Sequence, residues 1–265
     1  MEPQLDFSIV KRYYHISPEG ADHPFYEIPA ERLLDPDSLK TTLRTCGEVV
    51  QATSDALPAS FMGTTLCKLT LIQLLFAAQH DQFIDLSPGS LIFQLEMHDD
   101  HPHIGFKINS MHTEEIPREE RQAFLAERWT AAYQAFITPA VKAFAAASGL
   151  KPEAIWQQFG GQLTYLRDFL AANERREAVI GKFDQGGRWL AELDGALFEQ
   201  RRNPFKHNPR YVENPFKPGE QWLLHSSCCL YDRRENGRKC YTCPRMTDDE
   251  REARKREMLS AAGNT

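Results

Sequence analysis

The sequence has little cysteine and no long apolar run. Only six of its 265 residues are cysteine. The longest apolar stretch, Leu69–Ala78, is about half as long as a bilayer span and is interrupted by Thr70 and Gln73. The first residues include acidic side chains and lack the apolar core of a secretory signal. We therefore expect a cytoplasmic protein, in which disulfides are rare and clustered cysteines usually hold a metal or do redox work.

Excess positive charge and the common catalytic motifs are also missing. The net charge is −6, whereas nucleic-acid-binding proteins are usually basic, so we expect no nucleic-acid partner. Gly160-Gly161 and Gly186-Gly187 form neither a P-loop nor a G-x-G-x-x-G pattern, so no nucleotide site is expected. The G-x-S-x-G motif of hydrolases and the H-E-x-x-H motif of zinc proteases are absent too. These absences leave the cysteines as the residues that can carry chemistry.

Apolar periodicity predicts a mainly helical chain. With 42% hydrophobic residues, a chain of this length can bury one sizeable core. Apolar residues recur at helical spacing. We expect a break between helices at Pro58, a kink at Pro139, a helix end at Gly149 and the start of the next helix at Pro152. Helices are expected over residues 38–57, 61–80, 118–149, 152–172 and 175–200, and after the capping box of Thr247 and Glu250.

Three shorter segments complete the predicted fold. SLIFQLEM (90–97) and HIGFKINS (103–110) alternate as an antiparallel hairpin does, and QWLLHS (221–226) is predicted to be a short strand. Residues 201–220 are rich in Pro and Asn and are predicted to form a loop. The sequence thus predicts an α+β fold in three parts: a mainly helical domain with a small antiparallel sheet (1–200), a C-terminal cysteine-rich module (201–246) and a charged tail (247–265).

Four of the six cysteines gather near the C-terminus, in the pattern C-C-x10-C-x2-C. They are Cys228, Cys229, Cys240 and Cys243. The stretch around them is polar and rich in Arg and Lys, whereas free cysteine is ordinarily buried as a small apolar residue. Such a cluster therefore indicates a metal site or a disulfide. Cys46 and Cys67 fall in helical apolar patterns and are predicted to be buried free thiols.

The spacing alone leaves two kinds of metal centre open. A structural zinc site commonly uses two short-spaced ligand pairs, and Cys240-x-x-Cys243 fits one of them. Cys228 and Cys229 fit less well, because successive side chains of an extended chain point to opposite faces. Adjacent cysteines are easier to place on the two irons of a [2Fe–2S] cluster, which usually takes four thiolates.

The cysteine pattern near the end of the chain resembles the signature of FhuF-like ferric siderophore reductases. The similarity extends over roughly residues 60–246, through SFMGTTLCKLTLIQLLF, FIDLSPGSLIFQLEM, EAIWQQFGGQLTYLRDFL, ALFEQRRNPF and QWLLHSSCC. The resemblance implies that Cys228, Cys229, Cys240 and Cys243 ligate a [2Fe–2S] cluster and that residues 201–246 form an iron–sulfur module. It also implies one-electron reduction of Fe(III) in a siderophore, which releases iron in the cytoplasm.

The same resemblance implies partners. They are a ferric siderophore of hydroxamate type, an electron donor such as a ferredoxin or an NAD(P)H-dependent reductase, and transient contact with a membrane or transporter. Two features depart from the family pattern. Members often carry Arg before the cysteine pair, where this chain has His225, Ser226 and Ser227, a change that bears on cluster potential or substrate contacts. The acidic–basic tail after Cys243 is the second, and it is expected to leave the chemistry unchanged.

Basic residues surround the cysteines. Residues 201–245 hold ten Lys and Arg against four Asp and Glu, although the whole chain is negative. This charge would stabilise an anionic cluster and attract an acidic donor or an anionic chelate. His207 and His225 are alternative ligands of the Rieske kind, which four available thiols make unnecessary. Candidate substrate contacts are Arg202, Lys206, Arg210 and Trp222.

Two other functions are compatible with the same residues. In one, a zinc ion held by the four cysteines stabilises an interaction domain that has no redox chemistry. In the other, an iron–sulfur cluster acts as an electron carrier or redox sensor for a protein partner. Metal content distinguishes the zinc protein from the other two, and oxidation by ferric chelates distinguishes a reductase from a carrier.

Overall fold

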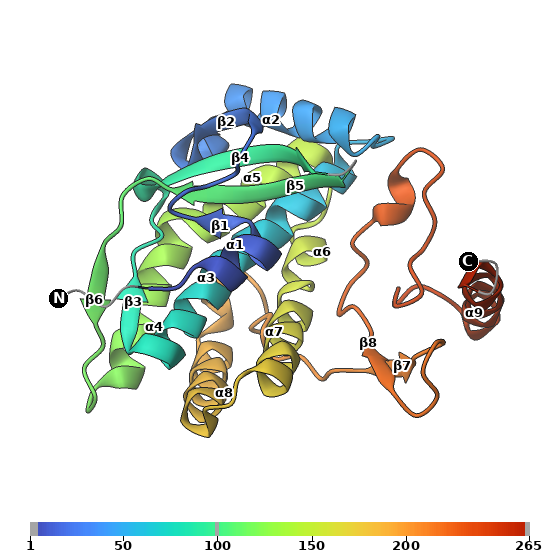
Figure 1. The fold of residues 1–265 in the computed structure, drawn as a ribbon. Coiled ribbons are helices and arrows are strands. Elements are labelled where there is room, and N and C mark those ends of the chain that lie inside the picture. The colour runs from blue at the N-terminus through green and yellow to red at the C-terminus, as the bar shows by residue number, and fades with distance from the viewer. Residues whose placement is uncertain (1–4, 99–100, 263–265) are drawn as a thin grey trace.

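A four-stranded sheet covers one side of a helical body (Figure 1). The computed structural model describes residues 5–98 and 101–262. The predicted hairpin is confirmed: β4 and β5 pair antiparallel, with Phe93 opposite Phe106. Strand β2 pairs antiparallel with β4, and the short β1 adds to β5 in parallel. The strands of this sheet are β1 (Ile16–Ser17), β5 (His101–Ile108), β4 (Leu91–His98) and β2 (Pro24–Pro29).

Helix α3 (Ala56–His80) forms the centre of the body. Most of its residues are buried, as expected for a helix that is apolar almost all round. It packs against α2 (Pro36–Val49), α5 (Thr138–Ser148), α7 (Phe159–Asn173) and α8 (Glu177–Glu192). By length and composition α3 could cross a membrane, but most of it lies inside the protein, as in the core helix of a globular protein.

The predicted buried thiols are confirmed, because Cys46 and Cys67 are almost fully enclosed in the core. The remaining elements lie around α3 or follow it in the chain. They are α1 (Ser8–Tyr14), α4 (Arg121–Ala132), α6 (Pro152–Trp156), β3 (Gln82–Ile84) and β6 (Thr113–Glu115), with 3-10 turns at Ala30–Leu34, Pro88–Ser90, Gly195–Phe198 and Tyr231–Arg233.

Several predicted helix boundaries are wrong, for reasons the prolines explain. The helix expected over 38–57 ends at Val49, and Pro58 lies inside the first turn of α3. Proline is tolerated there because the first N–H groups of a helix have no intrahelical partner. Before Pro139 the expected long helix passes through a π turn, Tyr133–Ile137, because proline cannot donate the next helical hydrogen bond.

Two further expectations need correction. The helix predicted over 152–172 is divided into α6 and α7 by Gln157 and Gln158. The predicted loop 201–220 contains strand β7 (Tyr211–Glu213), which pairs antiparallel with β8 (Gln221–Leu223). The pairing of β7 and β8 fixes the direction from which the chain enters the cysteine segment.

The C-terminal residues lie beside the helical body. Figure 1 shows the chain from β7 onward, in orange to red, alongside α6 and α7, with α9 (Asp248–Ala262) outermost. The predicted capping box starts α9: the Glu250 N–H donates to Thr247 Oγ1 (3.2 Å), and the Thr247 N–H donates to Glu250 Oε2 (2.8 Å). The α+β class with a mainly helical body is confirmed, whereas the division into three parts stays a prediction.

Candidate metal centre

The four clustered thiols meet in two pairs. The sulfurs of Cys228 and Cys243 are 3.8 Å apart, and the Cys229 thiol hydrogen-bonds the sulfur of Cys240. The neighbours Cys228 and Cys229 therefore face different members of the C-x2-C pair. This division is what the alternation of side chains along an extended chain requires.

This arrangement suits a cluster of two metal ions. Two thiolates bound to one tetrahedral metal, each about 2.3 Å from it, lie roughly 3.8 Å apart, which matches Cys228 and Cys243. Within residues 5–98 and 101–262, no three His, Cys, Asp or Glu side chains converge on a point that could hold a single ion. A [2Fe–2S] group takes two thiolates on each of its two irons, so two pairs of thiols fit it.

The thiols set one another's protonation. The hydrogen bond from Cys229 lowers the pKa of Cys240 to about 4 and raises the pKa of Cys229, and a hydrogen bond from His225 lowers that of Cys240 further. Burial raises the pKa of Cys243 to about 11. Because the thiolate is the form that binds metal, Cys240 is ready to bind, and the protonated thiols release protons on metal binding.

Helix α3 positions the first cysteine pair through a chain of hydrogen bonds. The Ser60 hydroxyl donates to the carbonyl of Cys229 (3.1 Å). The Gln158 amide in turn donates to Ser60 (2.9 Å), and Thr64 donates to Gln158 (2.9 Å). Ser60 and Gln158 are buried, so breaking this chain would leave polar groups without partners at a cost of about 1–3 kcal/mol each.

The loop between α2 and α3 holds the segment from another side. Both the backbone N–H and the hydroxyl of Thr53 donate to the carbonyl of Arg233, at 3.0 and 2.9 Å. Leu230 is buried against the start of α3 in a small apolar cluster, and Cys228 packs against that cluster. The segment thus rests on the body through both apolar and backbone contacts.

The glycine pair at the start of α7 permits a close approach. A methyl group on Gly161 would lie 2.6 Å from Ser226 Oγ, and one on Gly160 would lie 2.3 Å from His207 Cβ. The Gly161 N–H also donates to Ser226 Oγ (3.0 Å). The pair that matches no nucleotide motif is therefore where the cysteine module meets the body.

The charged tail supports the second cysteine pair. The Arg251 guanidinium of α9 donates to the carbonyl of Tyr241 and to that of Cys243 (3.1 Å). Lys239, beside Cys240, forms an ion pair with Glu250 of the same helix (2.7 Å). The tail therefore holds both ends of the C-x2-C turn, although its predicted lack of influence on the chemistry stays a prediction.

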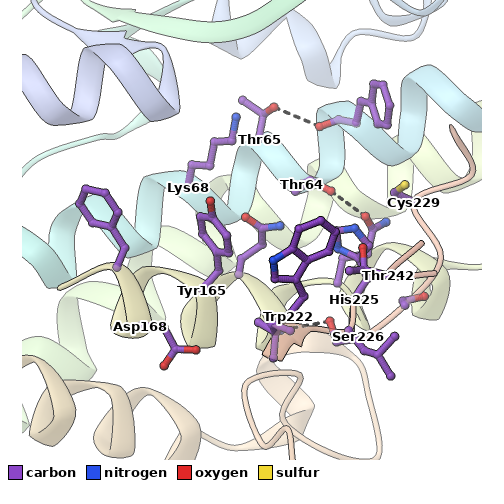
Figure 2. Close-up of a pocket in the computed structure, with 18 of the residues that line it drawn as sticks. Thr64, Thr65, Lys68, Tyr165, Asp168, Trp222, His225, Ser226, Cys229 and Thr242 are labelled. Carbon is purple, nitrogen blue, oxygen red and sulfur yellow. Dashed lines mark hydrogen bonds between the residues drawn. The ribbon is translucent and has the colours of Figure 1, made fainter. Parts of the chain in front are cut away.

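A cavity of about 880 Å³ adjoins this centre. Helices α3 and α7 form two of its sides, the start of β5 a third, and residues 221–229 close it toward the cysteines (Figure 2). Cys229 is part of the wall, as is Trp222. Other wall residues that matter below are Thr64, Lys68, Gln158, Tyr165, Asp168 and Ser226.

The predicted substrate contacts are only partly brought together. Trp222 lies in the cavity wall, but Arg202, Lys206 and Arg210 are exposed and do not line it. His225 lies in the wall and hydrogen-bonds the sulfur of Cys240. It therefore contacts a predicted ligand and does not take that ligand's place. Lys68 was not among the predicted site residues. Its position as a lone charge within the apolar α3 is a signal that could have identified it.

Comparison with known families agrees with the geometry. Residues 226–245 match the family model described as the FhuF 2Fe-2S C-terminal domain. The cysteine segment is therefore similar to FhuF-type [2Fe–2S] domains. The match confirms the resemblance for the cysteine-bearing part of the chain and makes [2Fe–2S] its cofactor, in place of zinc. No curated protein matches the chain.

Each of the four ligand cysteines is expected to be necessary for the FhuF-type cluster. Replacing Cys228, Cys229, Cys240 or Cys243 by Ala leaves one iron without its second thiolate, so the visible absorption and acid-labile sulfide should be lost. The matched controls are Cys46→Ala and Cys67→Ala, which alter buried thiols in the core. Loss of the chromophore in the Cys67 variant would show that the ligand set is wrong.

Gly161→Ala should loosen the attachment of the FhuF-type domain to α7. The added methyl group collides with Ser226, and overpacking of this kind typically costs about 1–3 kcal/mol. Urea unfolding and iron content should show lower stability and incomplete cluster loading. Gly181→Ala is the control, because nothing lies near its added methyl and alanine is favoured in a helix by about 0.5–1 kcal/mol. Equal stability and iron content of Gly161→Ala and wild type would contradict this role.

Arg251→Gln should make the cluster easier to lose. Hydrogen bonds from a charged group contribute about 1.5–3 kcal/mol each, and this variant loses the charge that holds the C-x2-C turn. The rate at which a chelator bleaches the visible absorption should rise several-fold. Arg256→Gln, an exposed change in the same helix, is the control and should bleach at the wild-type rate. If both variants bleach alike, α9 does not support the centre.

Proposed function

We propose that this protein reduces ferric siderophores by one electron and thereby releases their iron. The observation that carries the proposal is that Cys229, a cluster ligand, forms part of the wall of a cavity large enough for a small chelate. A ligand in this cavity would lie against the centre without an intervening layer of protein. Clefts of about 300–1,000 Å³ are the usual size for small-molecule sites.

The chemistry of the substrate explains why one electron is enough. Siderophores hold iron through hard oxygen donors, which favour Fe(III) over the softer Fe(II). When bound, the [2Fe–2S] group supplies single electrons, and the reduction of Fe(III) needs no general acid or base. The chain itself must bind the chelate, hold it beside Cys229 and keep the distance between the chelated iron and the cluster short. The cavity walls from α3, α7 and residues 221–229 support these roles.

The proposed electron donor is an acidic protein such as a ferredoxin or an NAD(P)H-dependent reductase. A second recess, of about 430 Å³, includes Cys240 in its wall. The basic side chains around it are Arg234, Arg238, Lys239 and Arg254. Arg238, Lys239 and Arg254 pair with Glu250 or Glu257, so Arg234 and the net positive charge of residues 201–245 would speed the approach of an acidic partner by long-range attraction. The cytoplasmic location and the transient contact with a membrane or transporter stay predictions.

The reductase proposal is tested by anaerobic titration of the dithionite-reduced protein. Ferric hydroxamate chelates should restore the absorption of the oxidised cluster, and an Fe(II)-specific dye should detect one Fe(II) for each cluster reoxidised. Gallium(III) complexes of the same chelators are the control, because gallium(III) is not reduced and should leave the spectrum unchanged. A ferric catecholate series run in parallel defines the preferred chelate.

One result would contradict the proposal while leaving the iron–sulfur centre intact. If ferricyanide reoxidises the protein but no ferric chelate does, the centre serves as an electron carrier or a redox sensor.

A further inference from the structure

The cavity contains one cation that no protein group neutralises. Lys68 is the only Lys or Arg among the described residues that line it. Within the described part of the chain, no side chain forms an ion pair or hydrogen bond with its ammonium. The residue lies in α3, whose neighbouring positions Cys67 and Leu69 are buried in the core.

An unpaired ammonium in such surroundings is costly to the free protein. Removal from water destabilises the charged form, and burial lowers the pKa of Lys68 to about 8. At neutral pH the group is therefore still mainly protonated. The exposed part of the Lys68 side chain faces the cavity. A ligand in the cavity can therefore supply a partner for the charge.

The other charged wall residue already has partners. Asp168 lies on the opposite wall, formed by α7, and Figure 2 shows it pointing away from Lys68. Its carboxylate lies 3.9 Å from Arg167 Nη1 and accepts a longer hydrogen bond from the Tyr211 hydroxyl at 3.5 Å. The unmatched charge of the cavity is therefore positive and lies at Lys68.

The neutral wall residues define the remainder of the ligand. Tyr165 and Trp222 offer aromatic surface, and Figure 2 shows Tyr165 close to Lys68, with Trp222 nearer to the cysteine segment. Three polar side chains of the wall already have hydrogen-bond partners. Thr64 donates to Gln158, Gln158 donates to Ser60, and Ser226 accepts from the backbone of α7. A ligand that fills the cavity thus meets aromatic faces, neutral polar side chains such as Gln162 and Gln221, and one ammonium.

We propose that Lys68 binds an anionic oxygen of the ligand that occupies this cavity. For a siderophore, which is the ligand under the proposed function, that oxygen is either an ionised chelating oxygen or a carboxylate attached to the chelator. Both sources present the same chemistry to the ammonium. In each case the ligand restores to Lys68 the electrostatic partner that the free protein lacks.

The proposal is tested with redox-inert probes, so that binding is measured apart from reduction. The probes are gallium(III) complexes of N-acetyl and N-succinyl desferrioxamine, which differ by the carboxymethyl group that ends the succinyl arm. Affinity for the cluster-loaded protein is measured by calorimetry and by quenching of tryptophan fluorescence. Lys68→Met should weaken binding about tenfold or more, as expected for loss of a charge-assisted hydrogen bond. Lys68→Arg should retain most of the affinity.

Three further readouts separate ligand binding from a structural role. The cluster absorption should be unchanged in every variant. The melting temperature of free Lys68→Met should equal or exceed that of wild type, because an unpaired, half-buried charge has been removed. Lys40→Met, which changes an exposed lysine of α2 outside the cavity, should bind both probes as wild type does. Lys68→Gln, which keeps a polar end without the charge, should bind as weakly as Lys68→Met.

The two probes identify the source of the anionic oxygen. A loss confined to the succinyl complex assigns the contact to the attached carboxylate, and an equal loss for both assigns it to a chelating oxygen. Wild-type affinity of Lys68→Met for both probes would overturn the proposal. So would reduction of ferric chelates by a protein that binds neither gallium complex, although the proposed function would then stand. Binding that depends on Lys68 without any reduction of Fe(III) would instead refute the function and leave the site.

Discussion

The segment that carries the four cysteines cannot fix their sulfurs by itself. Between β8 and α9 it has little regular structure, so its position comes from the surfaces it contacts. Ser60 holds the carbonyl of Cys229, the glycine pair of α7 admits Ser226, and Arg251 holds the C-x2-C turn. Each contact comes from a helix, and helices place groups more precisely than loops do. The two-pair arrangement of thiols depends on these contacts.

The same contacts create the cavity. The segment rests on α3 and α7 near Ser60 and Gly161 and leaves a space between these helices and residues 221–229. One face of residues 221–229 is therefore a wall for a small molecule, while their continuation supplies the cluster ligands. Proximity between the cavity and the centre needs no moving part, since Cys229 belongs to both.

Much of the fold could be predicted because local rules governed it. The hairpin of β4 and β5, the Thr247 capping box and the burial of Cys46 and Cys67 follow from alternation, capping chemistry and apolar periodicity. Predicted helix boundaries were wrong where a proline can either end a helix or lie in its first turn, as Pro58 does in α3. Strand β7 escaped prediction because three residues carry too little pattern.

The candidate site could likewise be predicted only where its residues lie close together in the sequence. The cysteine pattern is contained within sixteen residues, so it could be recognised from the sequence. The cavity could not, because Lys68, Tyr165 and Trp222 meet only after distant segments pack. Charge counting pointed to Arg202, Lys206 and Arg210, which are basic and near the cysteines in sequence but lie outside the cavity. Composition identified a charged neighbourhood without showing which way each side chain faces.

The shared use of residues 221–229 has a consequence for a chain that has not yet received its iron. Without the metal, the sulfurs lose the bonds that join Cys228 and Cys229 to the C-x2-C turn, and the adjoining wall loses one of its anchors. Loading of the cluster would thus add a second anchor to a wall that α3 and α7 already hold in place. Under the proposed function, an immature molecule would hold a chelate less firmly than a mature one.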